Sequence, residues 1–210
     1  MAVIFDCDGT LVDSEPLART AWERALAPHG YAVTEADLEA SVGLPYPRVH
    51  AYFAERVPLP SSEAFWEELS RELFALLDTA LTPFDDAVTA ARDLRARGVP
   101  VAVASSSPRE RLHRTLARAG LLDAFDVSIA GDEVEHGKPA PDMFLAAAER
   151  LGVEPAACVA IEDSPPGVAA AVAAGMRTLA ICRVPGTEAT LAAADRVVHT
   201  LSADVILDGR

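Results

Sequence analysis

The sequence predicts an α/β fold in which a doubly wound parallel sheet carries an inserted, all-helical domain. From residue 81 onward, short apolar runs alternate with segments of helical periodicity, which is the pattern of parallel strands joined by helices. Between residues 15 and 80, four helical stretches follow one another with no convincing strand between them. We therefore expect an α/β core formed by residues 1–14 and 81–210, and a helical cap formed by residues 15–80.

The expected strands are short and almost wholly apolar, as strands covered on both faces are. They are residues 3–5, 99–104, 127–130, 158–161 and 178–181. A helix is expected over residues 107–119, because Ser107, Pro108 and Glu110 form a capping box with proline at the first helical position. Ser107 is therefore expected to be the N-cap of that helix.

The four helical stretches of residues 15–80 have apolar residues three and four positions apart, so each can bury one face against the others. The anchoring residues are Leu17, Ala21, Ala25 and Leu26 in the first, Leu38 and Val42 in the weaker second, Val49, Tyr52, Phe53 and Val57 in the third, and Phe65, Leu69, Leu73 and Leu76 in the fourth. Trp22 and Trp66 have the same spacing, so we expect them in the core of this insert rather than on a ligand-binding surface.

The composition is that of a chain that can fold and that carries excess negative charge. Of the 210 residues, 50% are hydrophobic, and 18 basic against 32 acidic residues give a net charge of -14. Such a charge argues against nucleic acid and membrane surfaces as partners, and no apolar run approaches the ~20 residues that span a bilayer. Three cysteines without a C-x-x-C pair, and a start without signal-peptide features, predict a reducing, cytoplasmic location.

Polar residues follow the expected strands, at the edge where doubly wound sheets place their chemistry. These residues are Asp6 and Asp8 after the first strand, Ser105 after the second, Lys138 beyond the third, and Glu162 and Asp163 after the fourth. Because parallel strands end at one edge, we expect these groups to meet there. Clustered carboxylates repel one another unless a cation joins them, and Mg2+ takes carboxylates together with substrate phosphate and water. The sequence therefore predicts a magnesium-dependent phosphate site.

Some of these residues also have ordinary structural interpretations. Lys138 alone could be a solvated surface lysine, and Glu162 or Asp163 could cap the helix after Pro165. Their positions after the strands favour a role in the phosphate site. Asp163 is the better candidate for a metal ligand, and Glu162 would bind either the metal or the other metal ligands. The five histidines, at positions 29, 50, 113, 136 and 199, show no ligand spacing, so no histidine metal site is expected.

Four motifs, in order, resemble those of the haloacid dehalogenase superfamily. Residues 5–14, Phe-Asp-Cys-Asp-Gly-Thr-Leu-Val-Asp-Ser, are similar to the first motif, and Ser105 is similar to the second. Lys138, in Gly-Lys-Pro-Ala-Pro-Asp, resembles the third, and residues 162–167, Glu-Asp-Ser-Pro-Pro-Gly, resemble the fourth. A single Asp-x-Asp is common, but four motifs in family order are a specific signal. The insert resembles the cap of the branch that contains phosphoglycolate phosphatase and β-phosphoglucomutase.

This resemblance implies a Rossmann-like catalytic core and a phosphoric monoester hydrolase that works through an aspartyl-phosphate. Asp6 would be the nucleophile and Asp8 the general acid and base. Ser105 and Lys138 would hold the transferring phosphoryl group. The implied Mg2+ ligands are Asp6, the backbone carbonyl of Asp8, Asp163 and Glu162. The expected substrate is a small phosphorylated metabolite, either a sugar phosphate or a phosphoglycolate-like compound.

Two further residues are candidates for binding substrate. Ser106 directly follows the serine of the second motif. Arg48 belongs to an expected loop over residues 43–48, where a cation could pair with a second anionic group of the substrate. An ordinary surface arginine is an equally good interpretation of Arg48. No feature of the sequence indicates an oligomeric state.

Two other functions stay open at this point. A phosphomutase of the same branch would return the phosphoryl group to the sugar; the resembling mutase has a histidine where this chain has Ala18, and a phosphate-gripping arginine where it has Tyr46. Arg48, two residues further on, could replace that arginine. A signalling or binding module would use the acidic pocket without turnover, but such a module has no need of the second acid, Asp8.

Overall fold

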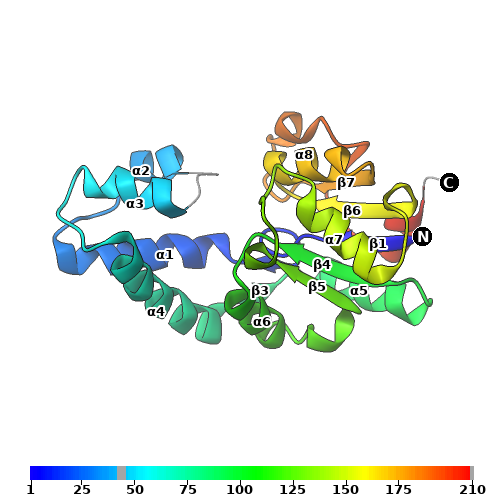
Figure 1. Cartoon of the computed structure of the whole chain (residues 1–210), viewed down its shortest axis with the longest axis horizontal. Helices are drawn as coiled ribbons and strands as arrows, with labels where there is room; N and C mark the ends of the chain where they lie inside the picture. The colour runs from blue at the N-terminus through cyan, green and yellow to red at the C-terminus, as the bar shows by residue number, and fades with distance from the viewer. Residues whose placement is uncertain (42–45, 209–210) are drawn as a thin grey trace. The chain divides into compact units, whose positions relative to one another are not determined.

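The computed structural model describes residues 1–41 and 46–208, and it confirms the predicted fold class (Figure 1). The chain divides into two compact units, one formed by residues 1–13 and 82–210, the other by residues 14–81. A six-stranded parallel sheet in the first unit has the order β5-β4-β1-β6-β7-β8. Its strands are β1 (Ala2–Phe5), β4 (Val101–Ser105), β5 (Val127–Ala130), β6 (Cys158–Glu162), β7 (Arg177–Ile181) and β8 (Arg196–Val198).

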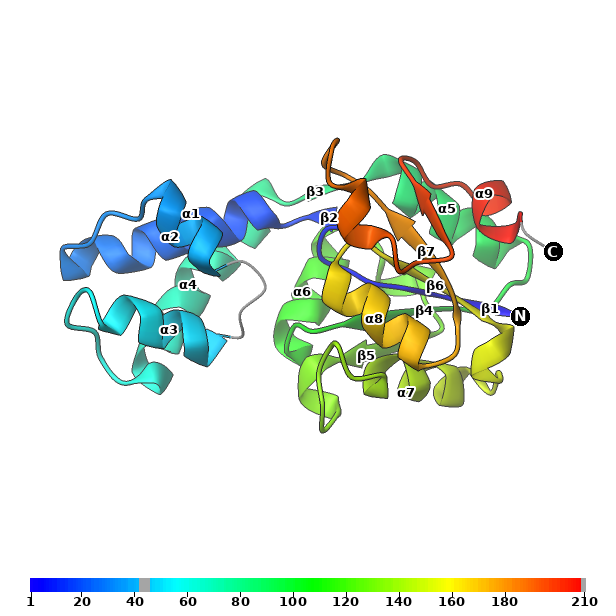
Figure 2. The same cartoon turned by 90° about the horizontal axis from the view of Figure 1, so that it is seen from above.

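The direction of the crossovers reverses at β1. The chain adds β4 and β5 on one side of β1, then crosses to β6, β7 and β8 on the other. Right-handed crossovers in opposite directions place their helices on opposite faces, so the sheet is doubly wound. Figure 2 shows α5 (Asp85–Ala96) and α7 (Asp142–Leu151) on opposite sides of the strands. The carboxyl ends of β4, β1 and β6 therefore lie side by side at one edge of the sheet.

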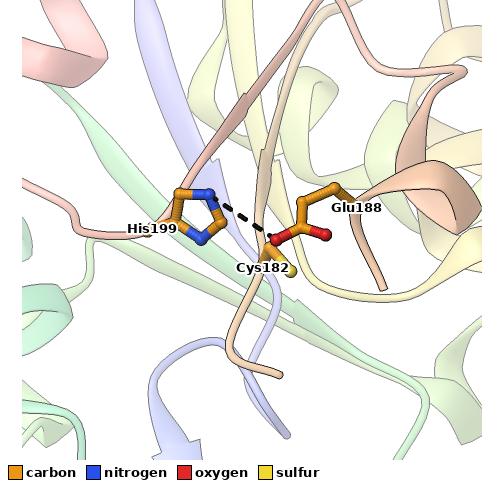
Figure 3. Close-up of side chains that lie close together, drawn as sticks. All are labelled: Cys182, Glu188 and His199. Carbon is orange, nitrogen blue, oxygen red and sulfur yellow. Dashed lines mark ion pairs between the residues drawn. The ribbon is translucent and has the colours of Figure 1, made fainter. Parts of the chain in front are cut away.

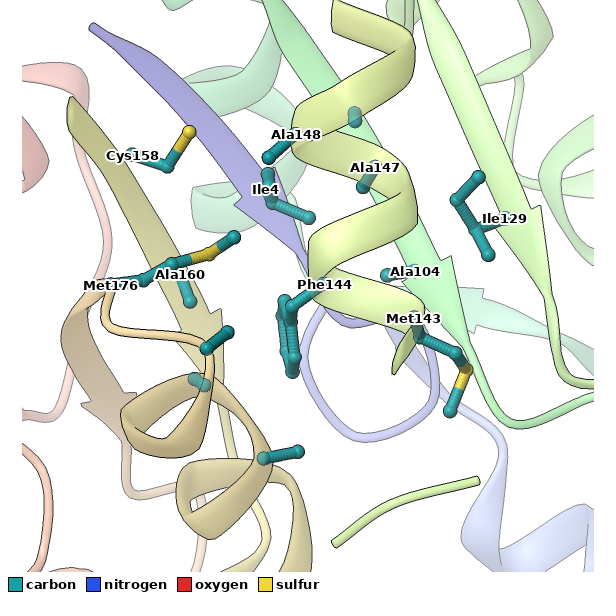
Figure 4. Packing of buried hydrophobic residues seen from close by; sticks show 14 of the residues in the cluster. Ile4, Ala104, Ile129, Met143, Phe144, Ala147, Ala148, Cys158, Ala160 and Met176 are labelled. Carbon is teal, nitrogen blue, oxygen red and sulfur yellow. The ribbon is translucent and has the colours of Figure 1, made fainter. Parts of the chain in front are cut away.

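One face of the sheet is covered by α7 and α8 (Pro165–Ala173) through small, buried side chains. In Figure 4, Phe144 and Ala147 of α7 lie over Ile4 of β1 and Ala104 of β4. All four are fully buried, and the alanines let the helix approach the strands closely. The remaining α-helices of this unit are α6 (Arg109–Arg118) and α9 (Ala203–Leu207), and α9 packs on α5. Among the described residues, no helix is both long and apolar enough to cross a membrane.

The described residues of the second unit form helices and no strand, as the sequence predicts. Its α-helices are α1 (Glu15–Leu26), α2 (Glu35–Ser41), α3 (Tyr46–Ala54) and α4 (Ser62–Ala80), and α1 packs along α4. Phe53 and Phe65 are buried at its centre, with Trp22 and Trp66 packed against them, so the expected aromatic core is confirmed. Val42, an expected anchor of the second helix, and residues 43–45 lie outside the described residues.

The two chain segments that lead into and out of the helical unit pair with each other. They form a two-stranded antiparallel sheet of β2 (Val12–Asp13) and β3 (Thr82–Pro83). The sequence pattern did not indicate this pair, because two-residue strands have no measurable periodicity. It also missed β8, an edge strand of three residues that begins with the exposed Arg196.

Two local expectations are wrong. The predicted cap at Ser107 is absent, because α6 begins at Arg109 with the extended Pro108 in the N-cap position and no side-chain cap. The predicted loop around Arg48 is partly helix, because α3 already begins at Tyr46. A proline in the first helical turn lacks only an N–H that would have no partner there, so Pro47 does not prevent that start.

Candidate active site

The end of β1 places Asp6 between two neighbouring strands. Phe5 lies opposite Val103 of β4 and Ile161 of β6, so Asp6 is level with Ala104 and Glu162, and Ser105 ends β4 one residue further on. The backbone N–H of Asp6 donates to the carbonyl of Ile161, at 2.8 Å, and continues the ladder for one more residue. The strand-end residues that the sequence singles out are thus brought together by strand register.

Lys138 joins Asp6 to Glu162. Its Nζ lies 2.5 Å from Asp6 Oδ1, 2.6 Å from Glu162 Oε1 and 3.2 Å from the carbonyl oxygen of Ala104. The three charged side chains are at most 9% exposed. A buried ammonium between two carboxylates is strongly held, because removing one partner would leave the others charged in a medium of low polarity.

The electrostatics of this triad favour a charged lysine and a high proton affinity at Asp6. Burial, the largest effect, raises the pKa of Asp6 well above its ordinary value; Lys138 acts in the opposite direction, and the charges of Glu162 and Asp163 add to the rise. Burial alone would lower the pKa of Lys138, but Asp6 and Glu162 outweigh it and raise that pKa above its usual range. Lys138 therefore stays cationic at neutral pH.

Three carboxylates converge where a metal ion could bind. Oxygen atoms of Asp6, Glu162 and Asp163 lie within 4.8 Å of one another. Asp6 Oδ2 is buried and has no hydrogen-bond partner in the described structure, which is costly unless a ligand occupies it. Burial and the charge of Glu162 raise the pKa of Asp163 to about 7. An all-oxygen set with an orphaned carboxylate atom fits a hard cation such as Mg2+.

Within this set, the hydrogen bonds of Glu162 leave neither of its oxygens unoccupied. Oε1 accepts from Lys138, and Oε2 accepts from the backbone N–H of Asp163 (2.9 Å), the backbone N–H of Ser164 (3.0 Å) and the hydroxyl of Ser164 (2.9 Å). A β-carbon on Gly167, in the first turn of α8, would lie 1.7 Å from Glu162 Oε1. Glu162 is therefore fixed by its neighbours. Its hydrogen bonds in turn orient Lys138 and the turn between β6 and α8. Its predicted role as a metal ligand stays a prediction.

Asp8 is held by side chains from β4, from α6 and from the segment between them. Its Oδ1 accepts from Arg111 Nη2 at 2.9 Å, and its Oδ2 accepts from the hydroxyls of Ser107 at 2.9 Å and Ser105 at 3.3 Å. The backbone N–H of Ser107 donates to Ser105 Oγ, which ties the two serines together. Ser107, expected to cap α6, is thus a residue of the site.

Sequence reasoning also missed Arg111. Its side chain is 19% exposed, and its Nε is buried without a hydrogen-bond partner in the described structure. The signal that could have found it is its place in the first turn of a helix that directly follows a strand end, where doubly wound folds position ligand-binding groups.

The comparisons with known proteins agree with this geometry. The sequence profile of the haloacid dehalogenase-like hydrolases matches residues 1–175. The chain belongs to this family. It is 35% identical, over 180 residues, to the fructose-1-phosphate phosphatase YqaB of Escherichia coli strain K12, covering 83% of this chain and 92% of that protein. The family membership predicted from the four motifs is confirmed.

Two further relatives of this haloacid dehalogenase-like hydrolase extend the comparison. The bifunctional riboflavin kinase/FMN phosphatase of Arabidopsis thaliana is 32% identical over 200 residues, which cover 95% of this chain but only 53% of that protein. A crystal structure of a candidate β-phosphoglucomutase from Thermotoga maritima has a TM-score of 0.82 at 30% identity, covering 98% of this chain and 96% of that one. The expected enzyme class, a phosphoric monoester hydrolase, agrees with the phosphatases among these relatives.

Two predicted substrate-binding residues of this hydrolase lie outside the buried contacts described above. Ser106 is exposed at the end of β4, between Ser105 and Ser107. Arg48 is exposed on α3, in the helical unit. Both remain predictions as substrate contacts.

Proposed function

We propose that this hydrolase is a Mg2+-dependent phosphatase that cleaves a small phosphorylated metabolite, such as a sugar phosphate, through an aspartyl-phosphate on Asp6. The observation that carries the proposal is the state of the Asp6 carboxylate. Lys138 holds one oxygen, and the other oxygen is buried without a partner beside Asp163. In its ionised form, a carboxylate fixed in this way is oriented to attack phosphorus, with its charge offset by a permanent cation. The similarity to a fructose-1-phosphate phosphatase supports the substrate class.

Asp6, Asp163 and the backbone carbonyl of Asp8 are the groups that would hold Mg2+. When bound, the ion would supply positive charge that offsets repulsion between anionic nucleophile and anionic phosphate. Lys138, which is bonded to Asp6, and the Ser105 hydroxyl, which is bonded to Asp8, would contact the phosphoryl oxygens. The buried setting strengthens each of these interactions, because little water is present to compete for the charged atoms.

Asp8 would move the protons in both half-reactions. In the first, an oxygen of Asp6 bonds to phosphorus, the phosphorus–oxygen ester bond breaks, and Asp8 gives its proton to the leaving alkoxide. In the second, water attacks the phosphorus of the aspartyl-phosphate and its proton passes to Asp8. Asp6 leaves as a carboxylate, and inorganic phosphate is released. Ser107, Ser105 and Arg111 would keep the Asp8 carboxyl in place for both transfers.

A screen of phosphorylated metabolites, with and without Mg2+, tests the proposal. We expect phosphate release from at least one sugar phosphate or phosphoglycolate-like compound, loss of activity in EDTA, and recovery on adding Mg2+. Asp6→Asn should abolish turnover, and Asp163→Ala should raise the Mg2+ concentration required. Asp123→Asn, at an exposed position of the α/β unit, is the matched control and should behave as the wild type. Full activity in Asp6→Asn, or in thoroughly chelated protein, would overturn the mechanism.

A further inference from the structure

A second group of metal-ligating side chains lies at the carboxyl ends of β7 and β8 and shares no residue with the acidic cluster. Cys182 directly follows β7, His199 directly follows β8, and Glu188 is the first residue of the short 3-10 helix η5 (Glu188–Leu191). The sulfur, an imidazole nitrogen and a carboxylate oxygen all lie within 4.8 Å of one another. Figure 3 shows the three side chains converging from these three segments.

The backbone of this region fixes where the three side chains start. The N–H of Cys182 donates to the carbonyl of Val198 at 2.8 Å, which holds the ends of β7 and β8 together next to His199. Gly186, with a φ of 91°, turns the chain back, and its N–H donates to Glu188 Oε1 at 3.2 Å. This turn therefore brings the carboxylate of Glu188 close to the thiol of Cys182.

The ligand types, and the separation between Glu188 and His199, suit a borderline-soft cation. Glu188 Oε1 and His199 Nε2 lie 3.8 Å apart. Ligand atoms of a tetrahedral zinc ion, bound at roughly 2.0–2.3 Å, lie about 3.3–3.8 Å from one another. Sulfur, nitrogen and carboxylate oxygen are the three donor types that zinc takes in proteins, whereas Mg2+ prefers oxygen alone. Together the three side chains can form a zinc site.

We propose that Cys182, Glu188 and His199 bind one Zn2+ per chain, with water as the fourth ligand. A thiolate and a carboxylate neutralise the charge of the ion. Cys182 is buried, whereas the side chains of Glu188 and His199 are 41% and 62% exposed, which leaves a solvent-facing side for the water. The bound ion fastens η5 to the ends of β7 and β8. This site does not depend on the proposed phosphatase function.

The histidine analysis of the sequence gave no sign of this site. Its ligands are six and eleven residues apart along the chain and belong to three different segments. Short-range ligand spacing cannot reveal such a site, because the pairing of β7 with β8 is what brings Cys182 and His199 together.

Cobalt spectroscopy tests the proposal on full-length protein without a histidine tag. Excess Mg2+ is present, so that it competes with Co2+ for the acidic cluster. Co2+ bound to a thiolate gives a charge-transfer absorption in the near ultraviolet, and Zn2+ should displace it at one equivalent per chain. We expect Cys182→Ser to remove the absorption, and His199→Ala or Glu188→Gln to weaken Zn2+ binding at least about tenfold. Zn2+ should also raise the melting temperature of the wild type.

Matched controls separate this site from others in the chain. His136→Ala removes an exposed histidine that also pairs with a carboxylate, Asp142, at 3.2 Å, and it should leave Zn2+ binding unchanged. Asp6→Asn should keep the cobalt absorption. An absorption that is absent in the wild type, or that persists in Cys182→Ser, overturns the proposal. If Cys182→Ser fails to fold, unchanged Zn2+ affinity in both His199→Ala and Glu188→Gln overturns it equally.

Discussion

Arg111 Nη2 lies 2.9 Å from Asp8 Oδ1, so a side chain from the first turn of α6 holds the second aspartate of the site. The same carboxylate accepts from the hydroxyls of Ser105 and Ser107 on its other oxygen. Three donors on one carboxylate fix its orientation. We infer that Arg111 is a positioning residue for the proton transfers proposed for Asp8.

Replacing Arg111 should therefore lower kcat more than it changes KM. We expect Arg111→Ala to reduce kcat on the order of 10-fold or more, because small misplacements of a catalytic group are costly. Arg111→Lys should recover part of the loss, since it restores the charge but not the guanidinium geometry. Arg118→Ala, at an exposed position near the other end of α6, is the control. A rise in KM with unchanged kcat would instead identify Arg111 as a substrate contact.

Gly167 tests how tightly Glu162 is held. A β-carbon there would lie 1.7 Å from Glu162 Oε1, the atom that accepts from Lys138. In an ordinary helical position, Gly→Ala stabilises by roughly 0.5–1 kcal/mol. Here we expect Gly167→Ala to lower both the melting temperature and the rate of hydrolysis, because Glu162 cannot move without releasing Lys138. In Gly137→Ala, where nothing lies within 4 Å of the added carbon, the melting temperature should change little. A more stable, fully active Gly167→Ala would show that Glu162 is free to shift.

The acidity of Asp37 predicts how the stability of the helical unit depends on pH. Burial alone would raise the pKa of Asp37, but hydrogen bonds from Thr34, Tyr52 and Tyr31 outweigh it and lower that pKa to about 2. The ordinary value is 3.8. The stabilisation is thus fully present above about pH 4 and is lost as the pH falls through about 2. Asp37→Asn should melt at a lower temperature than the wild type at pH 7, and the difference should shrink between pH 4 and pH 2.

Tryptophan fluorescence reports the unfolding of the helical unit, which contains Asp37. The chain has two tryptophans, Trp22 and Trp66, and both belong to the helical unit. Asp123→Asn, in the other unit, is the control and should leave the tryptophan-monitored melting temperature unchanged at every pH. A difference between Asp37→Asn and wild type that stays constant from pH 7 to pH 2 would mean that the network does not lower the pKa of Asp37.

The parallel sheet explains why much of the candidate site could be predicted from the sequence. Asp6, Ser105 and Glu162 each end or follow an apolar run, and parallel pairing brings all such ends to one edge. Lys138 is placed less directly by this rule, because it stands beyond the third strand and a loop carries it to Asp6, 132 residues away in the sequence.

The residues that sequence reasoning missed depend on side-chain direction. Ser107 matches the capping-box pattern, but the helix begins one residue later than expected because Pro108 is extended. The hydroxyl of Ser107 donates to Asp8 instead. From the sequence, Arg111 looks like an ordinary exposed residue of a helix, and only the structure shows its hydrogen bond to Asp8, which follows β1. Arg48 shows the reverse case, since an expected loop residue is an exposed position on α3.

The last prediction separates phosphate hydrolysis from sugar phosphate isomerisation. Where the resembling mutase has an arginine for the distal phosphate, this chain has Tyr46, whose hydroxyl donates to the carbonyl of Ser62 at 2.6 Å and whose ring packs against Trp66 with centroids 4.6 Å apart. Tyr46 is therefore committed to the core of the helical unit, and Ala18 offers no imidazole in place of the mutase histidine. Without these groups, a bisphosphate intermediate should not be held long enough to reorient.

With β-glucose 1-phosphate, Mg2+ and catalytic glucose 1,6-bisphosphate, we expect free phosphate to form faster than glucose 6-phosphate. Arg48→Ala should leave that ratio unchanged. Glucose 6-phosphate forming much faster than phosphate in the wild type, and not in Arg48→Ala, would establish a mutase in which Arg48 replaces the missing arginine.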